Sequence, residues 1–237
     1  MPVLLARPRL EMRHRRMRAS APGQSALLMA DIAESLAGQG VRYAVIGAMA
    51  AAVHGVVRAS LDADAIVALH VREAQDLRQS LIEEGYEVAL RTGDVDDPIP
   101  GLLEIRDRYG NRVDLLLGLR GMDPELLNRT RPVRFGEAVL AIVSREDFVA
   151  MKAFAGGQVD LADARAVIEL DRGSLDLELL RRLAQRFGRD AARIVEDLLG
   201  AADEILRHIL AVAAHHLRLA VEHGIAVAAD NLGGRAR

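Results

Sequence analysis

Residues 42–69 read RYAVIGAMAAAVHGVVRASLDADAIVAL, and this stretch decides the expected fold. An apolar strand over 42–46 is predicted to end at Gly47, and an alanine-rich helix over 48–53 follows it. A second apolar strand is expected over 61–69. A strand, a glycine turn, a helix and another strand in this order are typical of a mixed α/β protein.

Elements of both kinds are expected on either side of this stretch. Before it, apolar residues at helical spacing predict a helix over 26–36, with Ser25 as its N-cap. After it, helices and strands are expected to alternate up to residue 143. These are a helix over 72–84, a strand over 86–90, a loop over 91–101, a β-hairpin of 102–106 and 112–117 around Tyr109-Gly110-Asn111, a short helix over 124–129 and one or two strands over 133–143.

From Ser144 onward the pattern becomes helical. Ser144 and Asp147 resemble a capping box in which Asp replaces the usual Glu, and Gly156-Gly157 should end that helix. Further helices are expected over 161–170, 177–187, 191–199 and 203–229. The chain is therefore predicted to be of the α+β (mixed α/β) class: a basic, flexible leader over 1–24, a core with a short mixed sheet over 25–143 and a helical region over 144–230.

The composition excludes several classes of function. The 237 residues include no cysteine, which excludes disulfides, thiolate metal sites and thiol catalysis. No apolar run approaches the roughly 20 residues of a membrane span, so we expect a cytoplasmic protein. A net charge of −3 gives no general affinity for nucleic acid, but arginines crowd the leader and favour a phosphate-rich partner such as RNA; a simple solvated leader is the alternative. These arginines are Arg7, Arg9, Arg13, Arg15, Arg16 and Arg18.

Three aspartates interrupt apolar strands. Asp62 and Asp64 lie two residues apart in a strand, so their carboxylates should project from the same face, with Cα atoms roughly 6.5–7 Å apart. Two like charges there are costly unless a cation lies between them, and carboxylates suit Mg²⁺. An isolated Asp-x-Asp is more often a surface or turn feature, but Asp114 in the apolar run 113–117 supplies a third carboxylate. If the two strands are neighbours, all three converge; the third could bridge to a second ion and take a proton from an attacking hydroxyl.

Other residues have chemistry suited to phosphate. Gly47 would let backbone N–H groups approach a phosphate at the start of the helix that includes Ala48. Arg58 and Ser60 lie just before the aspartate pair, where Arg58 could orient phosphate or pair with a carboxylate. Lys152 is the one lysine in a chain whose other strong bases are arginines, and the two side chains are not interchangeable at a tight phosphate site.

Taken in order, Gly47-Ala48, His54-Gly55-x-x-Arg58-x-Ser60-x-Asp62-x-Asp64 and Val113-Asp114 resemble the DNA polymerase β-type nucleotidyltransferase superfamily, and look closest to AbiEii-like, toxin-type, stand-alone bacterial members. The resemblance covers about residues 41–170, including Lys152 with Asp160 and Asp163. It implies that Asp62 and Asp64 hold Mg²⁺ against a nucleoside triphosphate and that Asp114 completes the site and helps to deprotonate the acceptor. It also implies that Gly47 and Ala48 cradle the phosphates, that Lys152 contacts one of them, and that Asp160 and Asp163 order the second helix or bind Lys152.

The resemblance implies a Mg²⁺-dependent enzyme that moves a nucleoside monophosphate from an NTP to a hydroxyl. The acceptor could be an RNA or tRNA end, a protein or a small molecule, and a toxin-type enzyme would have a protein antitoxin as partner. Ala48 departs from the usual Ser or Gly, Ser60 from Thr, and Ala63 from a larger apolar residue, but no carboxylate is lost. The alternatives are a catalytically silent binding or regulatory module with a helical interface, and a structural domain with chance acidic residues. Residues 203–237 have no functional assignment.

Overall fold

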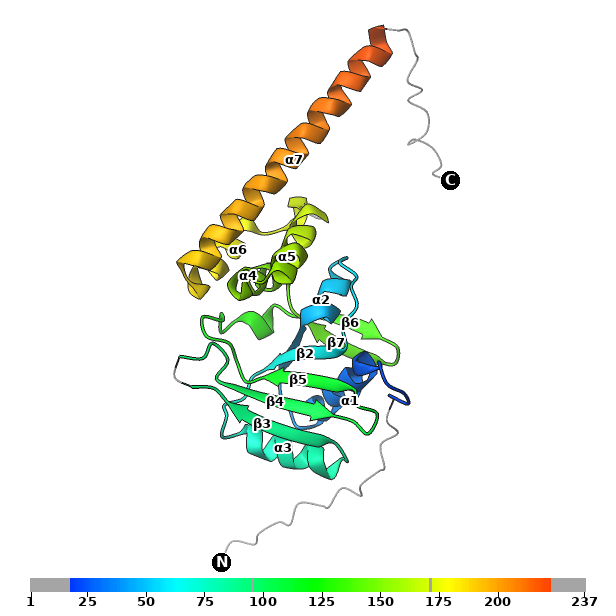
Figure 1. Cartoon of the computed structure of the whole chain (residues 1–237), viewed down its shortest axis with the longest axis vertical. Helices are drawn as coiled ribbons and strands as arrows, with labels where there is room; N and C mark the ends of the chain where they lie inside the picture. Colours follow the sequence, from blue (N-terminus) through cyan, green and yellow to red (C-terminus); the bar gives the residue numbers. More distant parts are fainter. Residues whose placement is uncertain (1–17, 95, 171, 223–237) are drawn as a thin grey trace, which may run out of the picture.

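A seven-stranded mixed sheet organises the chain, with the strand order β3-β4-β5-β2-β1-β7-β6 (Figure 1). The structure is a computed structural model that describes residues 18–94, 96–170 and 172–222. Together with the helices, the sheet gives the mixed α/β fold expected from the sequence. The strands are β1 (Tyr43–Ile46), β2 (Asp62–Val67), β3 (Glu87–Thr92), β4 (Gly101–Arg106), β5 (Arg112–Leu116), β6 (Arg131–Phe135) and β7 (Ala138–Ile142).

The centre of the sheet brings together strands that are distant in the sequence. Strand β2 pairs antiparallel with β1 and parallel with β5, while β4 and β5 form the expected antiparallel hairpin. Along β2, Ala63 and Ala65 are fully buried, and Asp62 and Asp64 point to the opposite face because side chains alternate along a strand. The pairing of β2 with β5 is what carries the first two aspartates to the third.

Helices cover the sheet and build the second half of the chain. Helix α1 buries Leu28, Ile32 and Leu36 against β2, β5 and β7, which confirms its predicted apolar spacing. No helix in the described part of the chain is long and apolar enough to cross a membrane. The helices are α1 (Ser25–Gly38), α2 (Gly47–Val53), α3 (Ala74–Glu83), α4 (Arg145–Ala155), α5 (Gln158–Leu170), α6 (Leu177–Phe187) and α7 (Arg189–Glu222), with short 3-10 helices η1 (Leu126–Asn128) and η2 (Arg172–Ser174).

Two sequence predictions about helices are wrong. The residue before α1 is Gln24, and Ser25 lies inside the first turn, where its hydroxyl donates to the carbonyl oxygen of Leu61 at 2.6 Å and accepts from the amide of Arg112 at 3.1 Å. The helices expected over 191–199 and 203–229 are one helix, α7, which continues through Gly200 and projects beyond the rest of the fold (Figure 1). A single glycine costs a helix only about 1 kcal/mol, which the burial of Val195 and nearby apolar residues outweighs. The part of that prediction beyond residue 222 lies outside the described residues.

The end of the predicted leader is described from residue 18 onward. There the backbone N–H of Arg18 donates to Asp31 at 2.9 Å, and its guanidinium pairs with the same carboxylate at 2.6 Å. The backbone N–H of Gln24 donates to the side chain of Asn111 at 2.6 Å. These contacts fasten residues 18–24 to α1 and to the β4–β5 turn.

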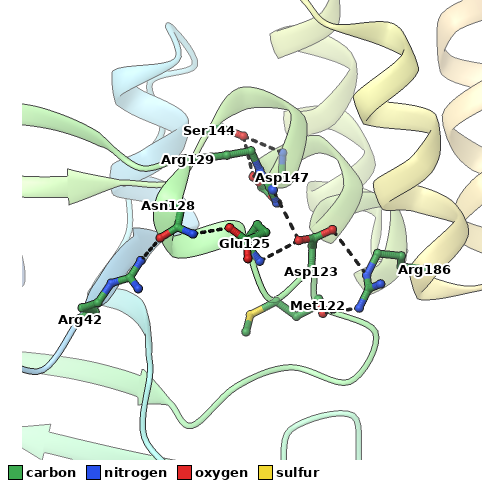
Figure 2. Close-up of polar contacts among 9 residues, drawn as sticks. All are labelled: Arg42, Met122, Asp123, Glu125, Asn128, Arg129, Ser144, Asp147 and Arg186. Atoms are coloured by element: carbon green, nitrogen blue, oxygen red, sulfur yellow. Dashed lines mark hydrogen bonds and ion pairs between the residues drawn. The ribbon is translucent and has the colours of Figure 1, made fainter.

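An ion-pair network joins the sheet half to the helical half, as Figure 2 shows. The buried carboxylate of Asp147, in the first turn of α4, accepts from Arg129 at 2.8 and 2.7 Å and from the hydroxyl of Ser144 at 2.8 Å. Asp123 lies 3.5 Å from Arg129 and 3.8 Å from Arg186 on α6. The predicted capping box is therefore half present: Ser144 accepts from the amide of Asp147, but the carboxylate of Asp147 binds Arg129 instead of completing the box.

Candidate active site

The three predicted carboxylates lie together on one face of the sheet. Parallel pairing of β2 with β5 sets Asp64 directly beside Asp114. Asp62 lies two residues before Asp64, on the same face of β2. One carboxylate oxygen from each aspartate can be chosen so that all three lie within 4.8 Å of one another. Among the described residues, this is the one group of three or more potential ligand side chains gathered so closely.

The negative charge of the group is only partly compensated. Burial is the largest cause that raises the pKa of Asp64, and repulsion from Asp62 and Asp114 adds to it, so the pKa rises from an ordinary value of 3.8 to about 6. Attraction to Lys152 and Arg112 opposes this rise without cancelling it. Three oxygen donors that repel one another at close range are a ligand set that a hard divalent cation such as Mg²⁺ would stabilise.

Gly47 lies in close contact with the aspartate cluster. It is the first residue of α2 and follows Ile46, whose register partner on β2 is Asp64. Its φ of 62° is in the left-handed region, and a Cβ at this position would stand 2.2 Å from the Oδ2 atom of Asp64. Glycine is thus required here for two reasons, the backbone conformation and the space that the carboxylate occupies. The sequence singled out Gly47 for phosphate binding, and that role stays a prediction.

Two charged residues that the sequence analysis missed border Asp114. The guanidinium of Arg112 forms a two-point pair with this carboxylate: Nε donates to Oδ1 at 2.8 Å, and Nη2 donates to Oδ2. Glu104 on β4 is the register partner of Asp114 and lies 3.5 Å from Arg112. The spacing Arg112-x-Asp114 was a usable signal, because it is the same alternation that placed Asp62 beside Asp64.

The other predicted residues fall into two groups. Ser60 donates to Oδ1 of Asp62 at 2.8 Å, so it orients one carboxylate of the cluster. Lys152 on α4 pairs with Asp160 at 2.7 Å and with Asp163 at 3.0 Å, which confirms the expected contact with these aspartates. Asp163 is buried and also accepts from Nε of Arg58 at 3.1 Å. Both cations are therefore held by carboxylates of α5, and their contact with phosphate stays a prediction.

A cavity of about 460 Å³ adjoins Asp62. Its walls come from the start of α1, from α2, from the loop before β2 and from the β6–β7 hairpin. Ala48, Arg58 and Ser60 line it together with apolar side chains that include Phe135. A volume of this size is within the range of pockets that take a small molecule or part of a nucleotide.

The chain matches no protein-family model and no curated protein. Several solved proteins are similar to it in structure, and three of them follow. An antigenic nucleotidyltransferase-like protein from Paracoccidioides brasiliensis aligns with 77% of this chain and 95% of its own length, at 16% identity and a TM-score of 0.46. The lincomycin-bound lincosamide antibiotic adenylyltransferase LnuA aligns with 63% of this chain and 98% of its own, at 12% identity and a TM-score of 0.41. The enzyme ANT(2")-Ia in complex with adenylyl-2"-tobramycin aligns with 69% and 96%, at 16% identity and a TM-score of 0.46.

Proposed function

We propose that this protein is a nucleotidyltransferase that moves a nucleoside monophosphate from an NTP to an acceptor hydroxyl and releases pyrophosphate. The observation that carries the proposal is the convergence of Asp62, Asp64 and Asp114 from two adjacent parallel strands, with ligand atoms within 4.8 Å of one another. The order of Gly47, the Asp62–Asp64 pair and Asp114 in the sequence supports the same chemistry, through its resemblance to polymerase β-type nucleotidyltransferases.

The three aspartates would hold Mg²⁺, for which their oxygen donors and their unbalanced negative charge are suited. When bound, Mg²⁺ supplies positive charge that stabilises the developing negative charge on the phosphates. Ser60 keeps Asp62 in its orientation through the 2.8 Å hydrogen bond. Gly47 leaves room for Asp64, and the neighbouring backbone at Ala48 borders the cavity where we place part of the substrate.

The reaction makes one bond and breaks one bond. The acceptor oxygen attacks the α-phosphorus of the NTP, and the bond from that phosphorus to the bridging oxygen breaks, so that pyrophosphate leaves with the electron pair. We assign Asp114 to receive the proton of the acceptor hydroxyl, the role that the resemblance to polymerase β-type nucleotidyltransferases implies for this carboxylate. Lys152 and Arg58 would neutralise phosphate charge from the side of α4 and the loop before β2.

The test is a transfer assay with each α-³²P-labelled NTP, Mg²⁺ and three acceptor pools: total bacterial RNA, a protein extract and a small-molecule extract. Wild type should move label onto one pool, and Asp62→Asn and Asp64→Asn should each abolish transfer. The matched control is Asp76→Asn, which removes an exposed aspartate on α3 and should leave transfer unchanged.

The pool that gains label identifies the acceptor class. Label on RNA supports an RNA or tRNA end as acceptor, and label on protein or on a small molecule supports that class of acceptor instead. Absence of transfer with every NTP and every pool, from folded protein, would overturn the proposal and leave the alternative of a silent binding module.

A further inference from the structure

Arg112 already binds the carboxylate of Asp114, one of the three that would hold a metal ion. Both oxygens of Asp114 accept hydrogen bonds from this one guanidinium, from Nε at 2.8 Å and from Nη2. The side chain of Asp114 is 11% exposed and that of Arg112 is 32% exposed, so the pair is partly shielded from water. A two-point arginine–carboxylate pair is among the stronger polar contacts in proteins, so Arg112 competes with a metal ion for the oxygens of Asp114.

Glu104 offers the same guanidinium a second partner. It is the register partner of Asp114 on the neighbouring strand, and its Oε2 atom lies 3.5 Å from Nη2 of Arg112. Glu104 is itself kept ionised, because the hydrogen bond from Arg106 holds its pKa below the ordinary value. Arg112 therefore stands between two carboxylates: it is bonded closely to Asp114 and lies 3.5 Å from Glu104, which it shares with Arg91 and Arg106.

We propose that Arg112 is a positioning residue that acts as an internal counter-ion: it holds Asp114 while the cluster is free of metal, and it moves toward Glu104 when a divalent cation binds. This inference rests on the metal-binding function proposed above. Arg112 opposes metal binding in two ways, by occupying both oxygens of Asp114 and by adding a positive charge beside the cation. Glu104 lowers this opposition because it receives the displaced guanidinium.

The direction of the expected effect is unusual for a residue so close to an active site. Replacing Arg112 by glutamine should make Mn²⁺ bind about tenfold more tightly, since one elementary charge beside a divalent ion changes its affinity by about this factor even in a strongly screening medium. Replacing Glu104 by glutamine should weaken Mn²⁺ binding. The guanidinium of Arg112 then loses the carboxylate that would receive it and stays on Asp114. In the Arg112→Gln background, Glu104→Gln should change Mn²⁺ affinity much less than it does in wild type. This non-additivity would show that Glu104 acts on Mn²⁺ binding through Arg112 and not simply through its own charge.

The experiment measures binding of Mn²⁺ alone by electron paramagnetic resonance, without nucleotide, at pH 7.5. Arg108→Gln is the matched control, because Arg108 lies in the β4–β5 turn and its guanidinium contacts Tyr109, not Glu104 or Asp114. It removes an equal charge without touching Asp114, so Mn²⁺ affinity should change about twofold or less. Arg112→Lys serves if Arg112→Gln does not fold; it keeps the charge and loses the two-point fork, and it should bind Mn²⁺ more tightly than wild type by a smaller factor.

The outcomes separate this inference from the function on which it rests. Tighter binding in Arg112→Gln together with little change in Arg108→Gln supports the counter-ion role. Equal or weaker binding in Arg112→Gln, or an equal gain in both variants, overturns it while Mn²⁺ binding by wild type leaves the proposed function standing. If wild type binds no Mn²⁺, with or without an NTP, the proposed metal-dependent function and the inference fail together.

Discussion

Replacing Asp64 by asparagine should stabilise the metal-free protein, although it removes a proposed catalytic residue. The pKa of Asp64 rises from 3.8 to about 6 in the folded chain, so the folded state holds a proton more tightly than the unfolded state does. Stability that depends on this proton is present below pH 3.8 and is lost as the pH rises to about 6. At about 1.4 kcal/mol for each tenfold change in proton affinity, the ionised side chain costs the fold up to about 3 kcal/mol at neutral pH.

Asparagine has nearly the same shape and no charge, so Asp64→Asn should raise the free energy of unfolding by about 1–3 kcal/mol at pH 7.5 in EDTA. The gain should vanish at pH 4, where Asp64 in wild type is protonated, and it should shrink in Mg²⁺, which stabilises wild type alone. Urea unfolding followed by circular dichroism measures all three conditions. The control Asp76→Asn, on the exposed side of α3, should change stability by less than about 0.5 kcal/mol. A variant less stable than wild type at pH 7.5 in EDTA would refute the view that the three carboxylates repel one another in the free protein.

Three further predictions follow from the same contacts. Mn²⁺ affinity of wild type should fall about tenfold between pH 7 and pH 5, because Asp64 with a pKa of about 6 takes up a proton that competes with the ion; isothermal titration calorimetry at both pH values checks this, and a flat profile would contradict it. Gly47→Ala should destabilise the fold by about 1–2 kcal/mol because of the left-handed backbone, and it should weaken Mn²⁺ binding about tenfold because the new Cβ displaces Asp64. Thermal unfolding measures the first effect and Mn²⁺ titration the second. Unchanged Mn²⁺ affinity would show that the Asp64 carboxylate can accommodate a Cβ at residue 47. Asp147→Ala should lower the free energy of unfolding in urea by about 2–3 kcal/mol, because it leaves Arg129 without its two-point partner. The control Asp197→Ala breaks an exposed ion pair on α7 and should cause no measurable change. Equal effects would argue against a stabilising role for the network in Figure 2.

Local patterns in the sequence were sufficient for most of the fold. Short apolar runs predicted the strands that carry Asp62 and Asp114, and helical spacing predicted α1. Errors arose where tertiary contacts override local preference. Ser25 has the chemistry of an N-cap, but its hydroxyl is used to join α1 to Leu61 and to β5, and Gly200 does not interrupt α7.

The sequence could predict those parts of the site in which two residues lie two positions apart on a strand and therefore share a face. That rule placed Asp62 with Asp64, and it would equally have placed Arg112 with Asp114, had the basic residue been considered. Glu104 could not be found in this way, because its position beside Asp114 depends on the register of the β4–β5 hairpin. The pairing of Arg58 with Asp163 joins residues 105 positions apart, and no local pattern reports such a contact.

The ion-pair network between the two halves (Figure 2) would constrain how the proposed transferase could adapt to a new acceptor. Two residues separate the end of β7 at Ile142 from the start of α4 at Arg145, and Arg129 fastens the first turn of α4 to the segment that precedes β6. A hinge at this point would have to break that pair, so the helical half offers little freedom for adjusting to a larger molecule. Substitutions that change the choice of acceptor should be better tolerated in the β6–β7 hairpin, because it lines the cavity and its tip takes no part in this network. In a laboratory evolution experiment, altered specificity should therefore accumulate around Phe135 while Arg129 and Asp147 stay fixed.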